Sequence, residues 1–390
     1  MSAGIYLHIP FCKSRCSYCD FATDVWRGSD AVERYVDALC KEIDAFDGGF
    51  GPPWSTLVHL VRTGPKDRIP AETIYFGGGT PSLLEPSEIE KILDRVRLKF
   101  DISDDAEITM EMNPATVTPE SLAGYRNLGV NRASFGVQTF DDNALKLLAR
   151  GHDANDARAT FRMLRDAGFD NVSLDLIAGL PGQALDMWER NLDEAIAMSP
   201  EHLSLYLLEI HEGTPLAEQV RSNRQPMPDP ELAAEMYEVM IDRLAAAGYE
   251  QYEISNFSRP GYESRHNTKY WTLDPVFGFG VSAHSFDGRE RYANERDTAK
   301  YVDLIENQAS AENYRETIDI ASEYVFLGLR LEDGIDLGSY TERFGEVLIA
   351  KYRDEIDRLQ DSGLVEVNDN RIKLTRKGKL FSNEVFAVFV

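Results

Sequence analysis

Three cysteines stand close together near the start of the sequence, within the segment YLHIPFCKSRCSYCDF (residues 6–21). Cys12, Cys16 and Cys19 follow a C-x3-C-x2-C spacing in a chain that has four cysteines in all. Thiolates on one short loop can hold an iron–sulfur cluster, and three of them leave one iron of a cubane open to another ligand. Two alternatives remain open at this point: a structural zinc with His8 as the fourth ligand, or three unrelated buried thiols. Zinc motifs usually consist of two separated pairs of ligands, which favours the cluster.

The composition is that of a soluble globular protein, and it is strongly acidic. A chain of 390 residues suits one large domain and a smaller one. Acidic residues outnumber basic ones by 66 to 41, giving a net charge of −25. This argues against a nucleic-acid partner, because binding phosphates requires clustered Lys and Arg. The first residues lack the features of a signal peptide, and no run reaches the roughly 18 apolar residues of a membrane span. We therefore expect a cytoplasmic protein without a membrane span.

Six short β-like runs alternate with helix-like segments over the first part of the chain. The runs cover residues 4–9, 73–79, 107–113, 132–138, 171–180 and 202–210. Most are rich in apolar residues, which predicts strands that are covered on both faces. Two of the helical segments end at Gly168 and Gly248, a usual helix stop. Repeated strand–helix alternation predicts parallel βαβ units, and six units are too few to close an eight-unit barrel. We therefore expect an α/β fold, an incomplete parallel (β/α)6 barrel.

The pattern changes after residue 250, which predicts three parts of the chain. Residues 1–250 are the expected barrel, and residues 251–310 an irregular extension with loops and short strands. Residues 311–390 are expected to form a smaller C-terminal α+β domain. It contains the helical segment ETIDIASEYVFLGLRL (residues 316–331), a second helix near residues 347–360 and the hairpin-like LVEVNDNRIKLT. Helices followed by a hairpin predict a winged-helix-like domain. In so acidic a chain, a packing or lid role suits this domain better than DNA binding.

Polar or glycine residues stand at the ends of the expected strands. In a parallel barrel the carboxyl ends of the strands meet at one rim, where loops can converge on a ligand. The cysteine segment follows the first run. The later runs end at, or carry, Gly77–Pro81, Glu111 with Asn113, Gln138, Asp175 and Glu209. A purely structural role would scatter such residues over both ends, so their convergence predicts a ligand site at this rim.

The cysteine motif, the GGGTP that ends the second run and the six-unit barrel together resemble the radical S-adenosylmethionine (SAM) superfamily. Further segments resemble its branch of oxygen-independent coproporphyrinogen III oxidases and haem chaperones of the HemW type, over nearly the whole chain: YLHIPFC, FGGGTPSLL, TMEMNP, SFGVQTF, DLIAGLPGQ and LTRKGKLFSNEVF. The resemblance implies that Cys12, Cys16 and Cys19 ligate a [4Fe-4S] cluster, whose open iron chelates the amino and carboxylate groups of SAM. In this family one electron from the cluster cleaves SAM to a 5′-deoxyadenosyl radical.

The resemblance also implies which residues contact SAM. By their positions in the matching motifs they are Tyr6, Tyr18, Gly78, Gly79, Thr80, Glu111, Gln138, Arg150 and Asp175. Tyr18 is placed against the adenine, and the glycines and threonine of GGGTP approach the methionine amino group. Glu111 is placed to accept from the ribose hydroxyls, and Arg150 to pair with the methionine carboxylate. The alternatives are structural: Arg150 as an ordinary cation at a helix end, and Asp175 as a hydrogen-bonded strand residue.

The segment RHNTKYW (residues 265–271) matches the H-N-x-x-Y-W motif of the haem-chaperone branch. The resemblance implies that His266, Tyr270 and Trp271 contact haem. Imidazole is a good axial ligand, and aromatic rings offer flat faces to a porphyrin. Arg265 can meet a propionate. In the alternative interpretation His266 stabilises a buried loop and the aromatic rings pack in the core. His284 is a second candidate ligand.

Two features separate the oxidases from the chaperones. The oxidases resemble this chain but have a longer N-terminal extension and a further cysteine soon after the third ligand. Here eleven residues precede Cys12, and Phe21 stands two positions beyond Cys19. We therefore expect a haem chaperone that carries a SAM-ligated [4Fe-4S] cluster and transfers haem to an acceptor protein, with an electron donor if the chemistry is catalytic. The alternatives are radical decarboxylation of coproporphyrinogen III and a zinc-stabilised binding protein.

Overall fold

The computed structural model describes residues 2–26, 28–48, 68–368 and 370–390. The chain divides into two compact units, each made of segments far apart in the sequence. Unit 1 consists of Met1–Asp175, Glu209–Pro226 and Asp274–Thr317. Unit 2 consists of Leu176–Leu208, Met227–Leu273 and Ile318–Val390. None of the helices in the described ranges combines the length and the apolar character that crossing a membrane requires.

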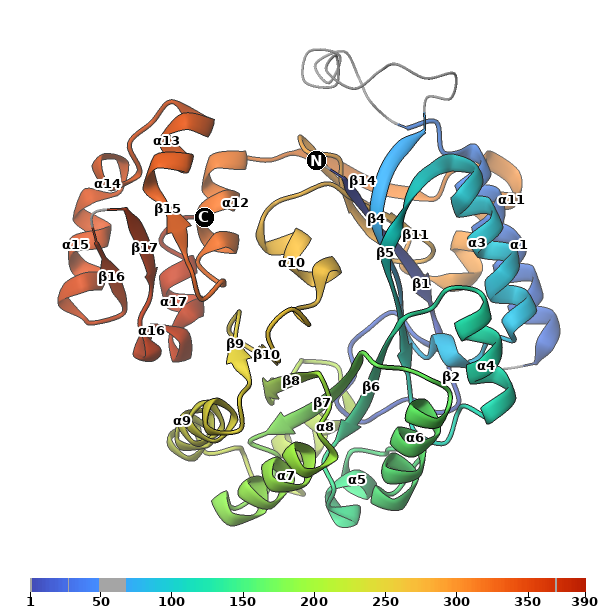
Figure 1. Ribbon diagram of the computed structural model, residues 1–390, viewed down its shortest axis with the longest axis horizontal. Helices are drawn as coiled ribbons and strands as arrows, with labels where there is room; N and C mark the ends of the chain where they lie inside the picture. The colour runs from blue at the N-terminus through green and yellow to red at the C-terminus, as the bar shows by residue number, and fades with distance from the viewer. Residues whose placement is uncertain (1, 27, 49–67, 369) are drawn as a thin grey trace. The chain divides into compact units, whose positions relative to one another are not determined.

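Six strands alternate with helices along the chain, as the sequence predicts (Figure 1). The strands are β1 (Ala3–Ile9), β4 (Ile69–Gly78), β5 (Phe100–Met112), β6 (Arg132–Gln138), β7 (Val172–Ala178) and β8 (His202–Leu207). The helices that follow them are α1 (Ser29–Ala45), α3 (Pro86–Lys99), α4 (Pro119–Asn127), α5 (Asp142–Leu147) with α6 (Ala154–Asp166), α7 (Leu185–Met198), and α8 (Pro215–Arg221) with α9 (Pro230–Ala246). In unit 1, β1, β4, β5 and β6 pair in parallel in that order. The predicted α/β class is confirmed.

Local sequence signals set the ends of the helices. α6 begins after Asp153, whose carboxylate accepts hydrogen bonds from the backbone N–H groups of Asn155 and Asp156. The chain leaves α6 and α9 through Gly168 and Gly248, which both have φ of 81°. A residue without a Cβ adopts this left-handed conformation at little cost. The two predicted helix stops are therefore confirmed.

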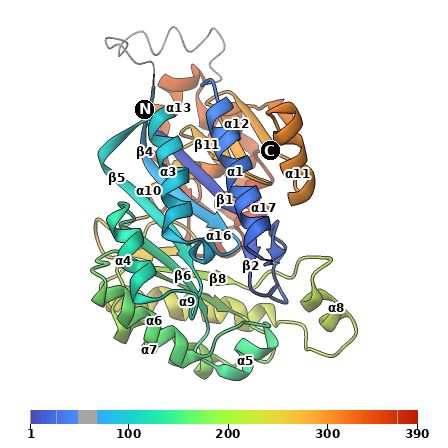
Figure 2. The ribbon, with the colours of Figure 1, turned by 90° about the vertical axis from the view of Figure 1, so that its right-hand side faces the viewer.

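One face of the unit 1 sheet is apolar and lies under α1 and α3 (Figure 2). Phe46, which follows α1, packs on Phe277 and Phe279 with ring centroids 5.1 and 5.3 Å apart. These two residues pair in register with Ile5 and Leu7 of β1, which are both fully buried. The apolar residues of the strands thus point toward the helices, and their burial holds the layers together.

The opposite face of the same strands is polar. Residues that pair in register across β1, β4, β5 and β6 form one row: Tyr6, Tyr75, Thr109 and Arg132. Closer to the carboxyl ends of the strands lie His8, Glu111 and Ser134, and every one of these seven residues is buried or half-buried. The strands are therefore covered on both faces, as expected, but only the face toward the helices is apolar.

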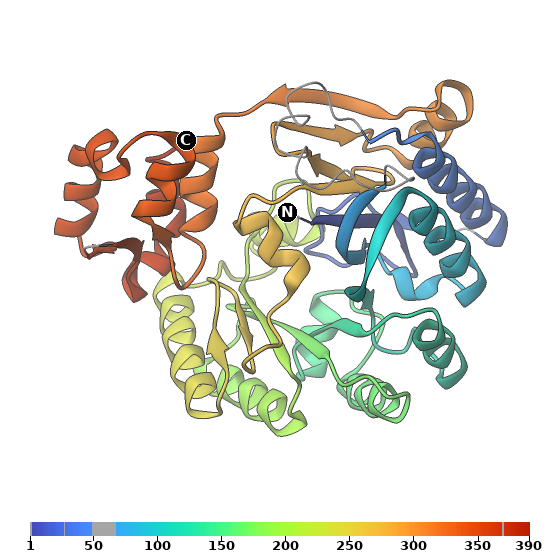
Figure 3. The ribbon, with the colours of Figure 1, turned by 45° about the horizontal axis from the view of Figure 1, so that its top comes forward.

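The segment predicted as an irregular extension adds further strands to the unit 1 sheet. β11 (Val276–Phe279) pairs in parallel with β1, and β12 (His284–Phe286), β13 (Glu290–Asn294) and β14 (Glu312–Thr317) continue the sheet with antiparallel pairing (Figure 3). The order of the strands that lie wholly in unit 1 is β14-β13-β12-β11-β1-β4-β5-β6. α11 (Thr298–Gln308) lies against α1, where Arg34 forms ion pairs with Asp303 and Glu306.

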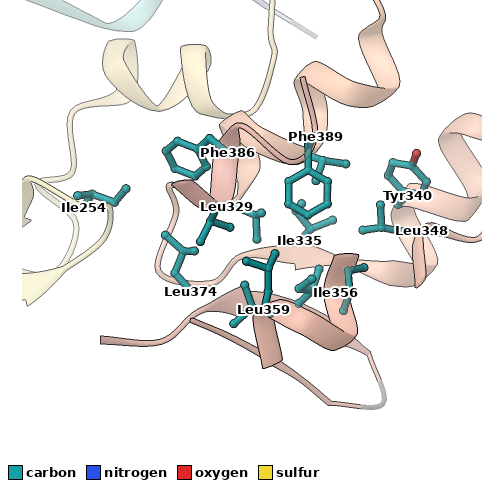
Figure 4. Close-up of a cluster of buried hydrophobic side chains, with 14 residues drawn as sticks. Ile254, Leu329, Ile335, Tyr340, Leu348, Ile356, Leu359, Leu374, Phe386 and Phe389 are labelled. Carbon is teal, nitrogen blue, oxygen red and sulfur yellow. The ribbon is translucent and has the colours of Figure 1, made fainter. Parts of the chain in front are cut away.

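The C-terminal part of unit 2 is a small α+β domain. Its helices are α12 (Ile320–Gly328), α13 (Leu337–Phe344), α14 (Leu348–Lys351), α15 (Arg353–Asp361), α16 (Arg376–Leu380) and α17 (Ser382–Phe386). β15 (Ile335–Asp336), β17 (Arg371–Leu374) and β16 (Val365–Val367) form its sheet in that order, and β16 and β17 are the predicted hairpin. Figure 4 shows Ile335, Ile356, Leu374 and Phe389 in the shared core. These helices and the three-stranded sheet with its hairpin make the predicted winged-helix-like arrangement.

One prediction in this region is wrong. The helical segment was expected from residue 316, but Glu312–Thr317 is strand β14 and α12 starts only at Ile320. Asp319 sets the start, because its carboxylate accepts from the backbone N–H groups of Ala321 and Ser322. Elsewhere in unit 2, β10 (Asn256–Ser258) pairs antiparallel with both β8 and β9 (Glu250–Gln251).

Candidate functional site

The cysteine loop, residues 12–19, follows β1 and is fixed by backbone pairing. β2 (Phe11–Cys12) pairs in parallel with β3 (Asp24–Val25). The backbone N–H of Ser17 donates to the carbonyl of Leu148 at 2.9 Å, and its carbonyl accepts from Leu216 at 2.8 Å. The three cysteines of the loop are half-buried and none forms a disulfide. The loop is thus held in place by the neighbouring strand β3 and by two distant segments of unit 1.

Burial affects the thiols of the cysteine loop. It raises the pKa of Cys12 to about 11 and also raises the pKa of Cys19, and the neighbouring thiols act in the same direction. Such thiols stay protonated at neutral pH until a metal displaces the proton. Thr80 Oγ1 donates to Cys12 Sγ at 3.6 Å, and Arg150 Nη1 donates to Cys16 Sγ at 3.4 Å. Thiolate ligands with hydrogen-bond donors beside the sulfurs are what an iron–sulfur cluster requires.

Asn113 connects these two donors. Its Nδ2 donates to Thr80 Oγ1 at 2.7 Å, and its Oδ1 accepts from Arg150 Nη2 at 2.6 Å. A continuous chain of hydrogen bonds therefore runs from Cys12 to Cys16 through three side chains from three loops. Asn113 is predicted to lie at the rim, but no role is predicted for it. The Asn-Pro pair directly after the strand is the local feature that could have pointed to it.

Arg150 is a half-buried cation held by the end of β6. Its Nη2 also donates to the carbonyl of Gly136 at 2.6 Å. A Cβ added at Gly136 would lie 2.5 Å from Gln138 Nε2 and 3.4 Å from Arg150 Nη2, so a larger residue here would push these side-chain ends aside. Gln138 itself has φ of 67°, a strained conformation that is frequent at functional sites. Arg150 Nε is buried and has no hydrogen-bond partner among the described residues. A guanidinium with a spare donor suits a ligand carboxylate.

Gly78 and Gly79 pack against the start of the cysteine loop. The backbone N–H of Gly79 donates to the carbonyl of Ile9 at 2.8 Å. A Cβ added at Gly78 would lie 2.7 Å from the His8 ring, and one added at Gly79 would lie 2.6 Å from the carbonyl oxygen of Pro10. Close packing between the ends of β1 and β4 therefore requires these glycines. This packing role is separate from the contact with SAM that the GGGTP motif predicts.

Both ring nitrogens of His8 already have partners. Nδ1 lies 3.0 Å from the hydroxyl of Tyr6 and Nε2 lies 2.9 Å from the carbonyl oxygen of Ala22. Burial lowers the pKa of His8 to about 4, so the imidazole is neutral at neutral pH. A zinc ion bound by His8 would have to break one of these hydrogen bonds. Across the described ranges, no group of three or more His, Cys, Asp or Glu side chains is arranged to hold a single metal ion.

Glu111 projects from the polar face of β5. Its Oε1 accepts from the hydroxyl of Tyr75 at 2.8 Å, and its Oε2 accepts from the backbone N–H of Gly78 at 3.0 Å. Burial raises the pKa of Glu111 to about 7, and the charge of Asp175 adds to this. Burial also raises the pKa of Tyr18, against the nearby positive charge of Arg150. These contacts bring the residues assigned to SAM together with the cysteine loop in unit 1.

The RHNTKYW segment forms the short helix α10 (Arg265–Trp271) in unit 2, rather than a loop. Ser264 begins it by accepting from the backbone N–H of Asn267. His266 is 1% exposed, and its Nε2 lies 3.2 Å from the hydroxyl of Tyr270, one turn later. His284 lies in unit 1, on β12, where it is exposed and its Nδ1 is 3.2 Å from the hydroxyl of Tyr314.

The C-terminal domain holds the last residue of α10. The guanidinium of Arg330 lies over the ring of Trp271, 4.2 Å from its centroid. Arg330 Nη2 also forms an ion pair at 3.3 Å with Glu253, whose side chain is fully buried. The indole Nε1 of Trp271 is buried and has no hydrogen-bond partner among the described residues. No motif in the sequence points to Arg330.

Comparisons with known proteins agree along the whole chain. The sequence profile of the radical SAM superfamily matches residues 6–195, and that of the HemN C-terminal domain matches residues 316–381. The Bacillus subtilis protein named heme chaperone HemW is 36% identical over 99% of this chain and 98% of its own length. The protein of the same name from Lactococcus lactis is 32% identical over 99% of this chain and 96% of its own length.

A solved structure shows the same fold. It is coproporphyrinogen III oxidase (HemN) from Escherichia coli, a radical SAM enzyme, with a TM-score of 0.82 and 24% sequence identity. The match covers 100% of this chain and 90% of the other. The identity to the B. subtilis and L. lactis proteins, over nearly their full lengths, establishes the relationship. The chain belongs to the radical SAM superfamily and, within it, to the family of the proteins named heme chaperone HemW.

Proposed function

We propose that the protein is a haem chaperone on a radical SAM scaffold, which binds haem and transfers it to an acceptor protein. The observation that carries this proposal is the 36% identity to the heme chaperone HemW of B. subtilis over 99% of this chain. The RHNTKYW motif adds to it, because it supplies an imidazole, a phenol and an indole on one short helix.

We infer that Cys12, Cys16 and Cys19 hold a [4Fe-4S] cluster and that SAM binds beside it. Such a cluster, when bound, supplies an electron to SAM at its open iron. Thr80 and Arg150 orient hydrogen-bond donors toward two of the cysteine sulfurs. The Nε of Arg150, which has no partner among the described residues, is available to the methionine carboxylate. Glu111 can accept from a ribose hydroxyl after it gives up its hydrogen bond from Tyr75 or from Gly78. Tyr6, Tyr18, Gly78, Gly79, Gln138 and Asp175 complete the proposed SAM site.

We assign the haem contacts to α10. His266 and Tyr270 are the two side chains of the motif whose atoms can bind iron, and Trp271 offers an aromatic face. The helix is anchored at both ends, by the Ser264 cap and by the stacking of Arg330 on Trp271. A short helix with fixed ends can hold the side chains that bind haem in place without enclosing the haem. Transfer to an acceptor requires that the haem can be released.

An anaerobic haem titration of the cluster-reconstituted protein, followed by visible absorption, tests the proposal. Saturable binding of about one haem per chain, followed by loss of haem to an apo-protein that binds it more tightly, is the expected result. Oxidative decarboxylation of coproporphyrinogen III with SAM and a reductant, in the absence of haem binding, would replace the proposal by the oxidase function. A colourless protein after reconstitution, with stoichiometric zinc, would replace it by the zinc-stabilised alternative.

A further inference from the structure

The hydrogen bonds between Arg150, Asn113 and Thr80 have a direction that the chemistry of these side chains fixes. A guanidinium can only donate, so the atom of Asn113 that lies 2.6 Å from Arg150 Nη2 is the side-chain carbonyl oxygen. The amide NH2 of Asn113 therefore faces the other way and donates to Thr80 Oγ1 at 2.7 Å. Because its oxygen accepts from Asn113, the hydroxyl of Thr80 directs its single hydrogen elsewhere.

The acceptor of that hydrogen is the sulfur of Cys12, which lies 3.6 Å from Thr80 Oγ1. Thr80 is 1% exposed, so bulk water cannot replace the sulfur as its partner. The bond from Asn113 also polarises the hydroxyl, and a polarised hydroxyl is a better donor. All of these residues belong to unit 1. Arg150 thus fixes the orientation of the Asn113 amide, and the amide fixes the orientation of the Thr80 hydroxyl toward Cys12.

Hydrogen bonds to the cysteine sulfurs of an iron–sulfur cluster affect its reduction potential. The reduced cluster carries one more negative charge than the oxidised cluster, and part of that charge lies on the sulfurs. A donor aimed at a sulfur therefore stabilises the reduced form more than the oxidised form. Its removal lowers the potential and makes the cluster harder to reduce.

Resting on the cluster proposed above, we propose that Asn113 is a positioning residue that aims the hydroxyl of Thr80 at the sulfur of Cys12 and so raises the reduction potential of the cluster. No bond forms or breaks in this role. The electron that reduces the cluster comes from an external one-electron donor, and Asn113 changes only the free energy of accepting it.

Redox titration of the full-length, cluster-reconstituted protein with dithionite tests this role, with the reduced cluster followed by electron paramagnetic resonance. SAM is left out, because Thr80 is also proposed to contact it. Thr80→Val removes the hydroxyl, and the matched control Thr80→Ser retains it. Asn113→Asp keeps an acceptor for Arg150 but replaces the amide donor by a second acceptor, which draws the Thr80 hydrogen away from Cys12.

The double variant Thr80→Val/Asn113→Asp separates orientation from charge. The added negative charge of Asn113→Asp lowers the potential in both backgrounds, whereas the reorientation of the hydroxyl acts only where Thr80 is present. A cycle of the four proteins therefore isolates the effect of the hydroxyl.

The expected result is a lower potential in Thr80→Val and a potential close to that of the parent protein in Thr80→Ser. We expect the equilibrium constant for reduction to fall at least about three-fold in Thr80→Val, where ten-fold corresponds to about 59 mV for one electron. Asn113→Asp should lower the potential more in the parent protein than in Thr80→Val.

Equal shifts by Asn113→Asp in the two backgrounds would overturn the proposal, because only the added charge would then act. A potential that Asn113→Asp alone does not lower would overturn it as well, and this comparison does not depend on Thr80→Val retaining the cluster. A parent protein that incorporates no four-iron cluster would instead overturn the proposed cluster itself.

Discussion

The guanidinium of Arg150 lies 3.4 Å from the sulfur of Cys16, although 134 residues separate them in the sequence. Arg150 is held in place by Asn113 and by the carbonyl of Gly136, both at 2.6 Å. The cation is therefore positioned by the ends of β5 and β6 and not by the cysteine loop. Pre-positioned groups of this kind need no reorganisation when a ligand arrives.

Replacing Asn113 with leucine is expected to destabilise the apo-protein by about 2–4 kcal/mol, because two hydrogen bonds are lost and one of them involves a charged donor. Urea denaturation followed by circular dichroism measures this. The variant should also incorporate less iron during reconstitution. The control is Asn127→Leu at the exposed end of α4, with an expected change below about 0.5 kcal/mol. Equal stability and iron content in the two variants would mean that the hydrogen bonds of Asn113 to Thr80 and Arg150 contribute neither to stability nor to iron incorporation.

Replacing Gly78 with alanine is expected to disrupt the packing of β4 on the cysteine loop. Gly78 has φ of 112°, and the added Cβ would lie 2.7 Å from the His8 ring. Gly213 has φ of 83° but no atom within 4 Å of the added Cβ, so Gly213→Ala isolates the backbone strain. We expect Gly78→Ala to be less stable than Gly213→Ala by at least about 2 kcal/mol, as for overpacked sites, in thermal or chemical unfolding. Similar stabilities would show that His8 moves aside freely.

Glu42 predicts a specific dependence of stability on pH. Its carboxylate accepts hydrogen bonds from the hydroxyl of Tyr301, the backbone N–H of Gly280 and the side-chain amide of Asn294. Burial nevertheless raises the pKa of Glu42 to about 7 from the usual 4.5. The folded state thus binds more protons than the unfolded state between these values. The contribution of Glu42 therefore falls as pH rises from 4.5 to 7, by about 3 kcal/mol in total.

Glu42→Gln removes this titration. Its free energy of unfolding relative to the parent protein should rise by about 3 kcal/mol between pH 4.5 and pH 7.5, whatever the constant cost of the lost hydrogen bonds. Guanidinium denaturation at several pH values measures it. The exposed Glu33→Gln on the same helix serves as the control and should leave the pH profile unchanged. A difference between Glu42→Gln and the parent that stays constant with pH would contradict the assignment.

Arg330 is expected to stabilise unit 2 because it neutralises a buried charge. Arg330→Met leaves the fully buried Glu253 without its cation, at a cost of about 3 kcal/mol. Arg343→Met, which also removes an arginine stacked on aromatic rings but at an exposed position, should cost about 0.5–1 kcal/mol. Chemical denaturation of both variants compares them. If the double variant Arg330→Met/Glu253→Gln were no more stable than Arg330→Met alone, the buried charge would not be the cause.

Much of the scaffold could be predicted because its signals are local. The six strands, the helices between them and the stops at Gly168 and Gly248 depend on short-range periodicity and on glycine conformation. The polar face of the strands was also visible, since Tyr6 and His8 alternate with Ile5, Leu7 and Ile9. A prediction that buried strands are apolar on both sides misses this face, because these strands are nearly buried on both sides although one side is polar.

The missed elements depend on distant partners. β11 is only four residues long, and its place beside β1 follows from pairing that no local pattern reports. β14 is fully exposed and exists because it pairs with β13, where Arg315 forms an ion pair with Glu290. In the site, the spacing of the cysteines is a local signal, and the cluster that it predicts stays a prediction. The contacts of Asn113, Arg150 and Arg330 were not predictable, since each joins separate segments of the fold.

The pairing of β1 with both β4 and β11 has a consequence for the order of assembly. β1 is synthesised well before β11, one of its two neighbours, which begins only at Val276. Until then β1, the strand that leads into the cysteine loop, has one unpaired edge. Its pairing with β11 joins residues far apart in the sequence, and such contacts form late in folding. If the proposed cluster depends on this sheet, nascent chains that end before β11, at about 275 residues, are expected not to retain it.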